Sequence, residues 1–139
     1  MTGLVVCVAV FAAAGIFGLV HRRTDGRTRV RSKDDGTRLT AAEIGGALGE
    51  RATLVQFSSA FCAPCRATRR TLAEVAEMVD GVVHVEIDAE AHLDLVRRLS
   101  ILKTPTVLVL DRNGAVRRRA AGQPRKADVI AAVGAAVDQ

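Results

Sequence analysis

The stretch Ser58-Ser59-Ala60-Phe61-Cys62-Ala63-Pro64-Cys65-Arg66 decides how the rest of the chain folds. Before it, residues 53–57 (TLVQF) form a short run of β-prone residues. After it, apolar residues recur at helical spacing, at Leu72, Val75, Ala76 and Val79. The sequence therefore predicts a strand, a tight turn and a helix in that order.

The two cysteines of this turn are spaced so that they can share a disulfide. The predicted turn places Cys62 at or beside the N-cap of the helix, where its sulfur faces backbone N–H groups without helical partners. These groups and the helix dipole favour a thiolate over a thiol, so a lowered Cys62 pKa is expected. Pro64 fits the first helical turn, where no N–H is needed.

A C-x-x-C pair is also compatible with a zinc site or with two structural cysteines. Structural zinc needs four ligands, and the other candidates, Cys7, His21, His84 and His92, are not paired at ligand spacing. Two inert buried cysteines are also conceivable, but the strand-then-helix context favours redox chemistry. We expect neither a metal nor an organic cofactor.

Composition indicates one modest domain with one core. The chain has 139 residues, of which 49% are hydrophobic, and its net charge is +5. Nearly all of the positive charge is arginine. Because aromatic residues are not interleaved with the basic ones and no nucleic-acid module is matched, binding to nucleic acid is not expected.

Residues 3–20 carry no charge, and a helix of this length covers about 27 Å of bilayer. We predict a single transmembrane anchor here. A cleaved signal peptide is the alternative, because Ala12-Ala13-Ala14 resembles a cleavage site, although no basic residue precedes the apolar run. Cys7 is interpreted as an apolar membrane residue.

Residues 21–35 are predicted to be a basic juxtamembrane linker. The stretch 21–38 holds seven Lys or Arg residues and three Asp residues. Basic residues directly after a span mark the cytoplasmic side. The sequence therefore predicts that the remaining residues, 36–139, form a domain in the cytoplasm.

The domain alternates strands and helices. A short edge strand is predicted at 37–39 and a helix at 40–49, opened by a capping box of Thr40 and Glu43. The helix after the cysteines is predicted to reach Asp80 and to end at Gly81. A strand at 82–87, a helix at 90–99 and strands at 106–110 and 115–120 follow, the last two joined by an Asn113-Gly114 hairpin. A last helix at 124–137 is predicted to bury Val129, Ile130, Val133 and Val137.

With these elements in place, residues 36–139 resemble the thioredoxin family. The resemblance is carried by Phe61-Cys62-Ala63-Pro64-Cys65 after a strand, Asp88 after the next, Thr104-Pro105-Thr106 before a third, and Gly122 after the last. It implies an α/β thioredoxin fold, a mixed central sheet with helices on both faces. It also implies that Pro105 is cis and stands against the dithiol.

The resemblance further implies roles for site residues. Cys62 would be the nucleophile and Cys65 the resolving cysteine. The backbone of Thr104 would pair with an extended substrate segment, and further substrate contacts would come from Phe61, Ala63, Pro64 and Gly122.

The chain departs from the family at three places. Phe61 and Ala63 replace the familiar Trp and Gly, and residues at such positions tune the redox potential. Gln56 stands where a buried Asp usually relays a proton to the resolving cysteine, so a possible relay would involve Gln56, water and His84. Arg66, Arg69 and Arg70 lie in the first turns of the helix, where a cation such as Arg66 favours a nearby thiolate.

The expected function is reduction of protein disulfides by thiol–disulfide exchange, with thioredoxin reductase or a membrane redox protein as a possible partner. Two alternatives stay open: a membrane-tethered module that docks peptides without turnover, and an oxidant or isomerase outside the cytoplasm. Membrane-anchored members of the family commonly place the domain outside, whereas the charges after residue 20 favour the cytoplasm.

Overall fold

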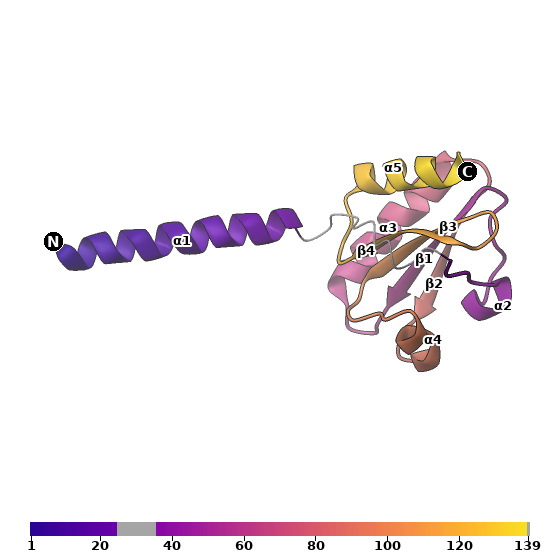
Figure 1. Cartoon of the computed structure of the whole chain (residues 1–139), viewed down its shortest axis with the longest axis horizontal. Coiled ribbons are helices and arrows are strands. Elements are labelled where there is room, and N and C mark those ends of the chain that lie inside the picture. The colour runs from indigo at the N-terminus through magenta and orange to yellow at the C-terminus, as the bar shows by residue number, and fades with distance from the viewer. Residues whose placement is uncertain (25–35, 139) are drawn as a thin grey trace.

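The computed structural model of the chain describes residues 1–24 and 36–138. Its first element is helix α1 (Thr2–Thr24), shown in Figure 1. Residues Thr2–His21 have a mean hydropathy of 2.6, and none of them is buried. This helix contains the predicted anchor 3–20, and its length and composition suit either a membrane span or a signal sequence. Of the predicted linker 21–35, residues 25–35 lie outside the described residues.

Within the described residues, four strands form one mixed sheet: β1 (Ala52–Ser58), β2 (Val82–Asp88), β3 (Thr106–Asp111) and β4 (Val116–Ala121). Their order is β2-β1-β3-β4, with β1 and β2 parallel and the other two pairs antiparallel. A βαβ unit followed by a ββα unit was predicted, and this topology confirms it.

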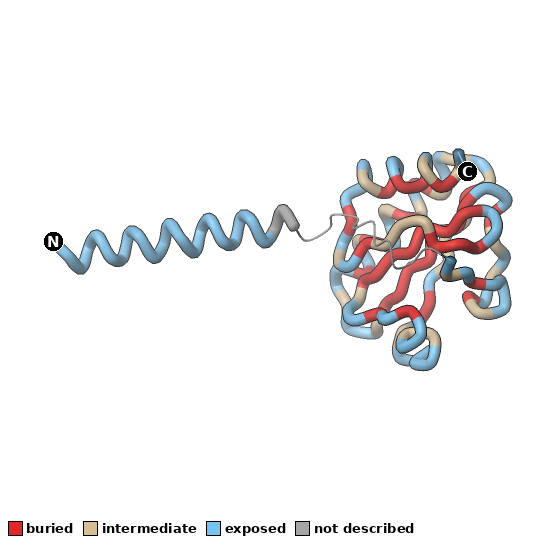
Figure 2. Tube along the Cα trace, viewed as in Figure 1, coloured by how far each residue is buried: buried red, intermediate tan, exposed pale blue. Residues whose placement is uncertain are grey.

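Helices cover both faces of the sheet (Figures 1 and 2). Apolar side chains of α3 (Ala63–Met78) and α5 (Lys126–Val137) pack on one face, with Leu72 and Val133 among them. Beneath the other face, α2 (Ala41–Ile44) and α4 (Leu93–Arg98) contribute to a second cluster that includes Ile44 and Val96. The predicted thioredoxin-type architecture is therefore present.

Strand β1 is buried along its whole length, and its side chains alternate between these two clusters. Leu54 packs on the α3 side, whereas Val55 and Phe57 pack on the other side. The same alternation turns Gln56 toward α3. Because β1 ends at Ser58 and α3 begins at Ala63, the turn that carries Cys62 lies directly after this buried strand.

The Asn113-Gly114 hairpin is held by a buried carboxylate at its base. Asp111 Oδ1 accepts the N–H groups of Asn113 and Ala115, at 2.8 and 3.0 Å, and Arg117 pairs with Oδ2. Burial acts to raise the pKa of Asp111, but these donors outweigh it and lower the pKa. Gly114 has a φ of +80°, and a Cβ there would meet the Leu39 carbonyl oxygen at 2.1 Å. Glycine is therefore required at this turn.

Several predicted boundaries were wrong. The capping box of Thr40 and Glu43 is present, but α2 ends at Ile44 and not at 49, because Gly45 adopts a left-handed conformation. The edge strand expected at 37–39 is reduced to a single bridge between Arg38 and Ala115. Helix α3 ends at Met78, followed by the extended cap residue Val79, so Gly81 lies in the next turn.

Two further predictions in the second half also need correction. Helix α4 begins at Leu93 and not at 90, because Asp88 holds the preceding turn by accepting the N–H of Glu90 at 2.9 Å. In α5, which begins at Lys126, Val129 and Val133 are buried and Val137 is partly buried, but Ile130 is 40% exposed. Ile130 immediately follows the inward-facing Val129, which turns it away from the sheet.

Candidate active site

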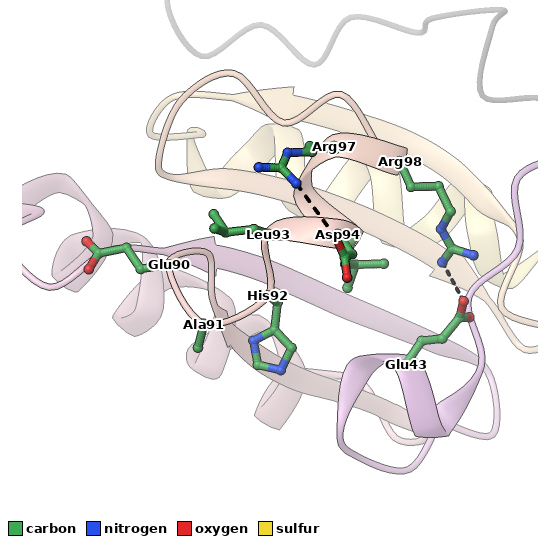
Figure 3. Close-up of a pocket in the computed structure, with 9 residues that line it drawn as sticks. Glu43, Glu90, Ala91, His92, Leu93, Asp94, Arg97 and Arg98 are labelled. Atoms are coloured by element: carbon green, nitrogen blue, oxygen red, sulfur yellow. Dashed lines mark ion pairs between the residues drawn. The ribbon is translucent and has the colours of Figure 1, made fainter.

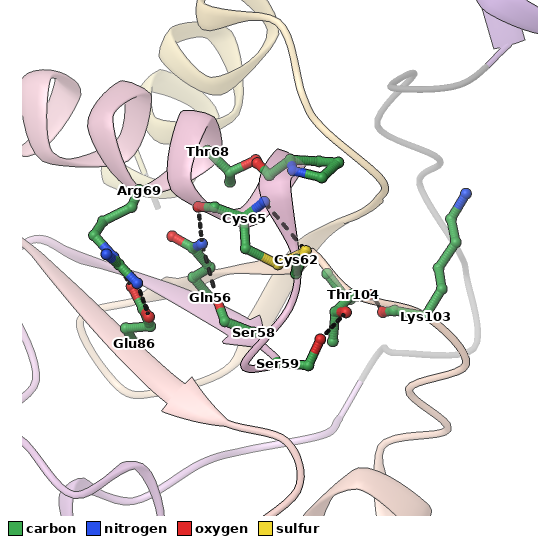
Figure 4. The surroundings of a disulfide bond; sticks show 12 residues. Gln56, Ser58, Ser59, Cys62, Cys65, Thr68, Arg69, Glu86, Lys103 and Thr104 are labelled. Atoms are coloured by element: carbon green, nitrogen blue, oxygen red, sulfur yellow. Dashed lines mark hydrogen bonds and ion pairs between the residues drawn. A yellow bond between two sulfur atoms is a disulfide. The ribbon is translucent and has the colours of Figure 1, made fainter.

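Cys62 and Cys65 form a disulfide at the N-terminus of α3, with their Cα atoms 5.2 Å apart (Figure 4). Cys62 is the N-cap residue, and its sulfur accepts the backbone N–H of Cys65 at 3.2 Å. Pro64 occupies the first turn, as predicted. Cys62 is partly exposed, whereas Cys65 is 2% exposed. An approaching molecule therefore reaches Cys62 first.

Gln56 hydrogen-bonds to the backbone of Cys65. Its side-chain amide is buried and donates to the Cys65 carbonyl oxygen at 2.8 Å and to Ser58 Oγ at 3.0 Å. This contact is with the backbone of Cys65. An amide cannot titrate, so Gln56 has the geometry of a residue that positions the cysteine.

His84 on β2 also hydrogen-bonds to the Gln56 side chain. Its Nε2 lies 3.1 Å from Gln56 Oε1, and because an amide oxygen only accepts, Nε2 is the donor. Burial lowers the pKa of His84, opposed by Glu86 and assisted by Arg69. Burial therefore favours the neutral form of His84, and the described contacts connect His84 to Cys65 through the Gln56 amide.

Arg66 and Arg69, in the first two turns of α3, differ in their contacts. Arg69 pairs with Glu86 of β2, with its Nη2 atom 2.6 Å from the carboxylate (Figure 4). Arg66 is exposed and lines a hollow with Phe61, Cys62, Ala63, Cys65 and Arg69, which we call the cysteine hollow. Arg66 lines the same hollow as Cys62, so it is placed to stabilise a Cys62 thiolate, as predicted from the sequence. Arg69 instead forms an ion pair with Glu86 of the sheet.

The Thr104–Pro105 peptide bond is cis, as the resemblance implied. Pro105 is buried, and its carbonyl oxygen accepts the N–H of Gly122 at 2.8 Å. Pro64, Thr104, Pro105 and Gly122 line a second hollow, which we call the proline hollow, together with Lys103, Arg125 and Lys126. The predicted substrate-contacting residues thus gather into two hollows, one with the cysteines and one beside them.

One connection at the site was missed by sequence reasoning. Ser59 Oγ lies 2.9 Å from Thr104 Oγ1, which joins the cysteine turn to the loop before Pro105 (Figure 4). The two residues are 45 positions apart. A serine before a turn is common, so no sequence signal distinguished this one.

A third hollow lies between α2 and α4, lined by residues that include Glu43, Glu90, His92 and Asp94 (Figure 3). Two of its carboxylates lie in ion pairs, Glu43 with Arg98 and Asp94 with Arg97. Across residues 1–24 and 36–138 there is no group of three or more His, Cys, Asp or Glu residues placed to hold a metal ion. His92 lies at the surface and its Nδ1 contacts the Asp88 carbonyl oxygen at 2.9 Å.

The Gln56→Leu variant tests how strongly this network supports the site. Leucine fills similar space but leaves the Cys65 carbonyl, Ser58 Oγ and His84 without their partner. We expect the free energy of unfolding to fall by about 2 kcal/mol, the cost of stranding buried polar groups. Urea denaturation measures it, with the Gln56→Glu variant, which keeps the side-chain length, as the comparison. Equal stability of wild type and Gln56→Leu would contradict this role.

The geometry defines an α/β protein with a dithiol at a helix N-terminus beside a cis-proline loop. Residues 41–135 match the family model named Thioredoxin, which is more than half of the chain. The chain therefore belongs to the thioredoxin family.

Individual relatives agree with this assignment. A thioredoxin of Mycoplasma genitalium is 29% identical over 77 residues, which covers 55% of this chain and 74% of the relative. The crystal structure of chloroplastic thioredoxin z superposes with a TM-score of 0.57 at 28% identity, covering 65% of this chain and 81% of that one. Thioredoxin f from spinach chloroplast gives 0.56 at 24% identity, covering 63% and 78%, which shows the shared fold. Family and cysteine pair together support thiol–disulfide oxidoreductase chemistry.

Proposed function

We propose that the chain is a membrane-anchored reductase of protein disulfides that works through the Cys62–Cys65 dithiol. The observation that carries the proposal is the difference between the two cysteines. Cys62 is partly exposed at the N-cap of α3, and Cys65 is buried behind it. One sulfur can therefore meet a substrate, and the other can act only after the first has reacted.

In the first step, the Cys62 thiolate attacks one sulfur of the substrate disulfide. A Cys62–substrate disulfide forms, and the other substrate sulfur leaves as a thiolate. The N-terminal N–H groups of α3 and the nearby Arg66 stabilise the attacking thiolate. The Cys65 N–H that reaches Cys62 Sγ in the oxidised form supplies one of these donors.

In the second step, Cys65 loses its proton to water and attacks Cys62 Sγ, which releases the second substrate thiolate. Two electrons pass from the dithiol to the substrate, whose two sulfurs take up two protons. Gln56 fixes the backbone of Cys65 during this step, and His84 keeps the Gln56 amide oriented. A dithiol donor, such as a thioredoxin reductase, would regenerate the reduced form.

The cis-proline loop would hold the substrate. We propose that the backbone at Thr104 pairs with an extended substrate segment and that Phe61, Ala63, Pro64 and Gly122 contact it on either side. The exposed Phe61 and the two hollows support this arrangement. Pro105 would set the separation between the segment and the dithiol.

A redox titration tests the proposal. The full chain with Cys7→Ser, in an uncharged detergent, is equilibrated with dithiol buffers of graded potential, and the free thiols are alkylated and counted by mass spectrometry. We expect reversible formation of the Cys62–Cys65 disulfide, with a midpoint near the reducing end of the range, about −270 mV. A midpoint near about −120 mV would indicate an oxidant instead. A pair that stays reduced throughout would favour docking without turnover.

A further inference from the structure

We propose that the hydrogen bond between Ser59 and Thr104 sets the position of a bound substrate relative to the dithiol. Ser59 Oγ and Thr104 Oγ1 lie 2.9 Å apart, and Figure 4 shows them beside Cys62. The inference rests on the proposed function, because it assigns Ser59 as a positioning residue for the same reaction. It applies to substrates that bind through their peptide backbone.

The two hydroxyl groups face each other because Ser59 and Thr104 continue the register of β1 and β3. Phe57 lies opposite Thr106 in the last pair of this antiparallel ladder. Two residues farther along β1 and two residues back from β3, the same register sets Ser59 opposite Thr104. Backbone pairing does not reach them, and Pro105 between them and the ladder has no N–H to donate. A side-chain contact therefore joins the two segments where the backbone ladder has ended.

This contact also connects the two hollows of the candidate active site. Ser59 lines the cysteine hollow, and Thr104 lines the proline hollow. In residues 1–24 and 36–138, the Ser59 hydroxyl is the one hydrogen-bond partner of Thr104. The backbone N–H and C=O of Thr104 are thus left for the substrate segment, while its side chain is tied to the cysteine turn.

A second hydroxyl shapes the same loop without reaching the cysteines. Thr106 Oγ1 donates to the Lys103 carbonyl oxygen at 2.6 Å, a bond that lies within the loop around Pro105. The Ser59–Thr104 bond instead crosses from this loop to the turn, three residues before Cys62. It is therefore the bond that fixes the separation between Thr104 and Cys62.

This separation matters only to a substrate that touches both segments. A peptide that pairs with the Thr104 backbone and reacts at Cys62 spans them, and its sulfur is aligned for attack only when their spacing is fixed. A small disulfide without a peptide backbone meets Cys62 alone. Ser59 and Thr104 are both half-buried, so water can satisfy either hydroxyl when the other is removed. Loss of the bond should therefore affect peptide reduction far more than stability.

Two disulfides test this role. One is a peptide with a single disulfide and uncharged flanking residues, and the other is hydroxyethyl disulfide. The reduced full chain with Cys7→Ser, in an uncharged detergent, is mixed with each, and the second-order rate constants of reduction are measured. In Ser59→Ala we expect the peptide-to-small-disulfide ratio of these constants to fall about fivefold, which corresponds to the loss of one ordinary hydrogen bond. The midpoint of urea denaturation should stay at the wild-type value.

Three further variants assign the effect to the bond. Thr104→Val removes the other hydroxyl, and adding it to Ser59→Ala should lower the ratio no further, because the same bond is lost only once. Ser59→Thr keeps a hydroxyl and should keep the wild-type ratio. Thr71→Val is the matched control: Thr71 also lines the proline hollow, but its hydroxyl donates to the Ala67 carbonyl oxygen within α3, at 3.2 Å.

The outcomes separate the two proposals. An unchanged ratio in Ser59→Ala would overturn the positioning role and leave the proposed function standing. An equal fall of the ratio in Thr71→Val would overturn it too, because the polarity of the hollow would then explain the effect. Losses that multiply in the double variant would show that the two hydroxyls act separately, against the proposal. Failure of the wild-type chain to reduce either disulfide would count against the proposed function itself.

Discussion

Replacing Cys62 by serine is expected to reduce turnover of a disulfide substrate to the background rate. Serine has no thiolate to attack a disulfide, and the remaining thiol of the pair, Cys65 in the first turn of α3, is only 2% exposed. Reduction of insulin, followed by precipitation of its freed B chain, measures the loss. Wild-type activity in Cys62→Ser would contradict the proposed mechanism.

Cys65→Ser is expected to give a different result. Cys62 is still at the helix N-cap and can attack once, but no second sulfur is available to release the substrate. A covalent adduct of chain and substrate should accumulate, visible by mass spectrometry and reversed by dithiothreitol. Cys7→Ser is the matched control, because Cys7 lies in α1, outside the described dithiol site, and its loss should leave turnover unchanged. Adducts that form equally on Cys62→Ser would show that the wrong cysteine had been assigned the attack.

The parts of the site that were predictable are local in sequence. The strand before Cys62, the turn, Pro64 in the first helical turn and the position of Cys62 at the N-cap all follow from a few neighbouring residues. The cis bond before Pro105 came from the family resemblance. These features depend on short-range geometry or on a motif, which a single sequence displays directly.

The parts that were not predictable depend on how strands align. Gln56 and His84 were named as members of a possible relay, but their direct hydrogen bond depends on a register of β1 and β2 that sets Leu54 beside His84 and Gln56 beside Glu86. The contact between Ser59 and Thr104 depends on the antiparallel pairing of β1 and β3. This pairing brings the loop before β3 to the end of β1. Helix α2 was predicted too long because a left-handed glycine at Gly45 ends it, a conformation that composition alone does not specify.

The membrane side of the dithiol sets which reductants and substrates it can meet. Helix α1 is long and apolar enough to span a bilayer. Six basic residues follow this span in the sequence: Arg22, Arg23, Arg27, Arg29, Arg31 and Lys33. An excess of Lys and Arg within about 15–20 residues of a span orients that end toward the cytoplasm. We therefore propose a single-pass anchor with the dithiol in the cytoplasm, where thioredoxin reductase could regenerate it.

Maleimide labelling of Cys62 in intact cells should show on which side of the membrane the dithiol lies. In a Cys7→Ser background, after reduction with a permeant thiol, a membrane-impermeant maleimide is expected to leave Cys62 unmodified until the membrane is permeabilised. The matched variant moves positive charge from the C-terminal to the N-terminal side of the span. It combines Thr2→Lys with substitution by Gln of Arg22, Arg23, Arg27, Arg29 and Arg31. In this variant the domain should face outward and Cys62 should react at once. Prompt labelling of the parent chain in intact cells would place the dithiol outside, where an oxidant or isomerase acting on exported proteins becomes the better assignment.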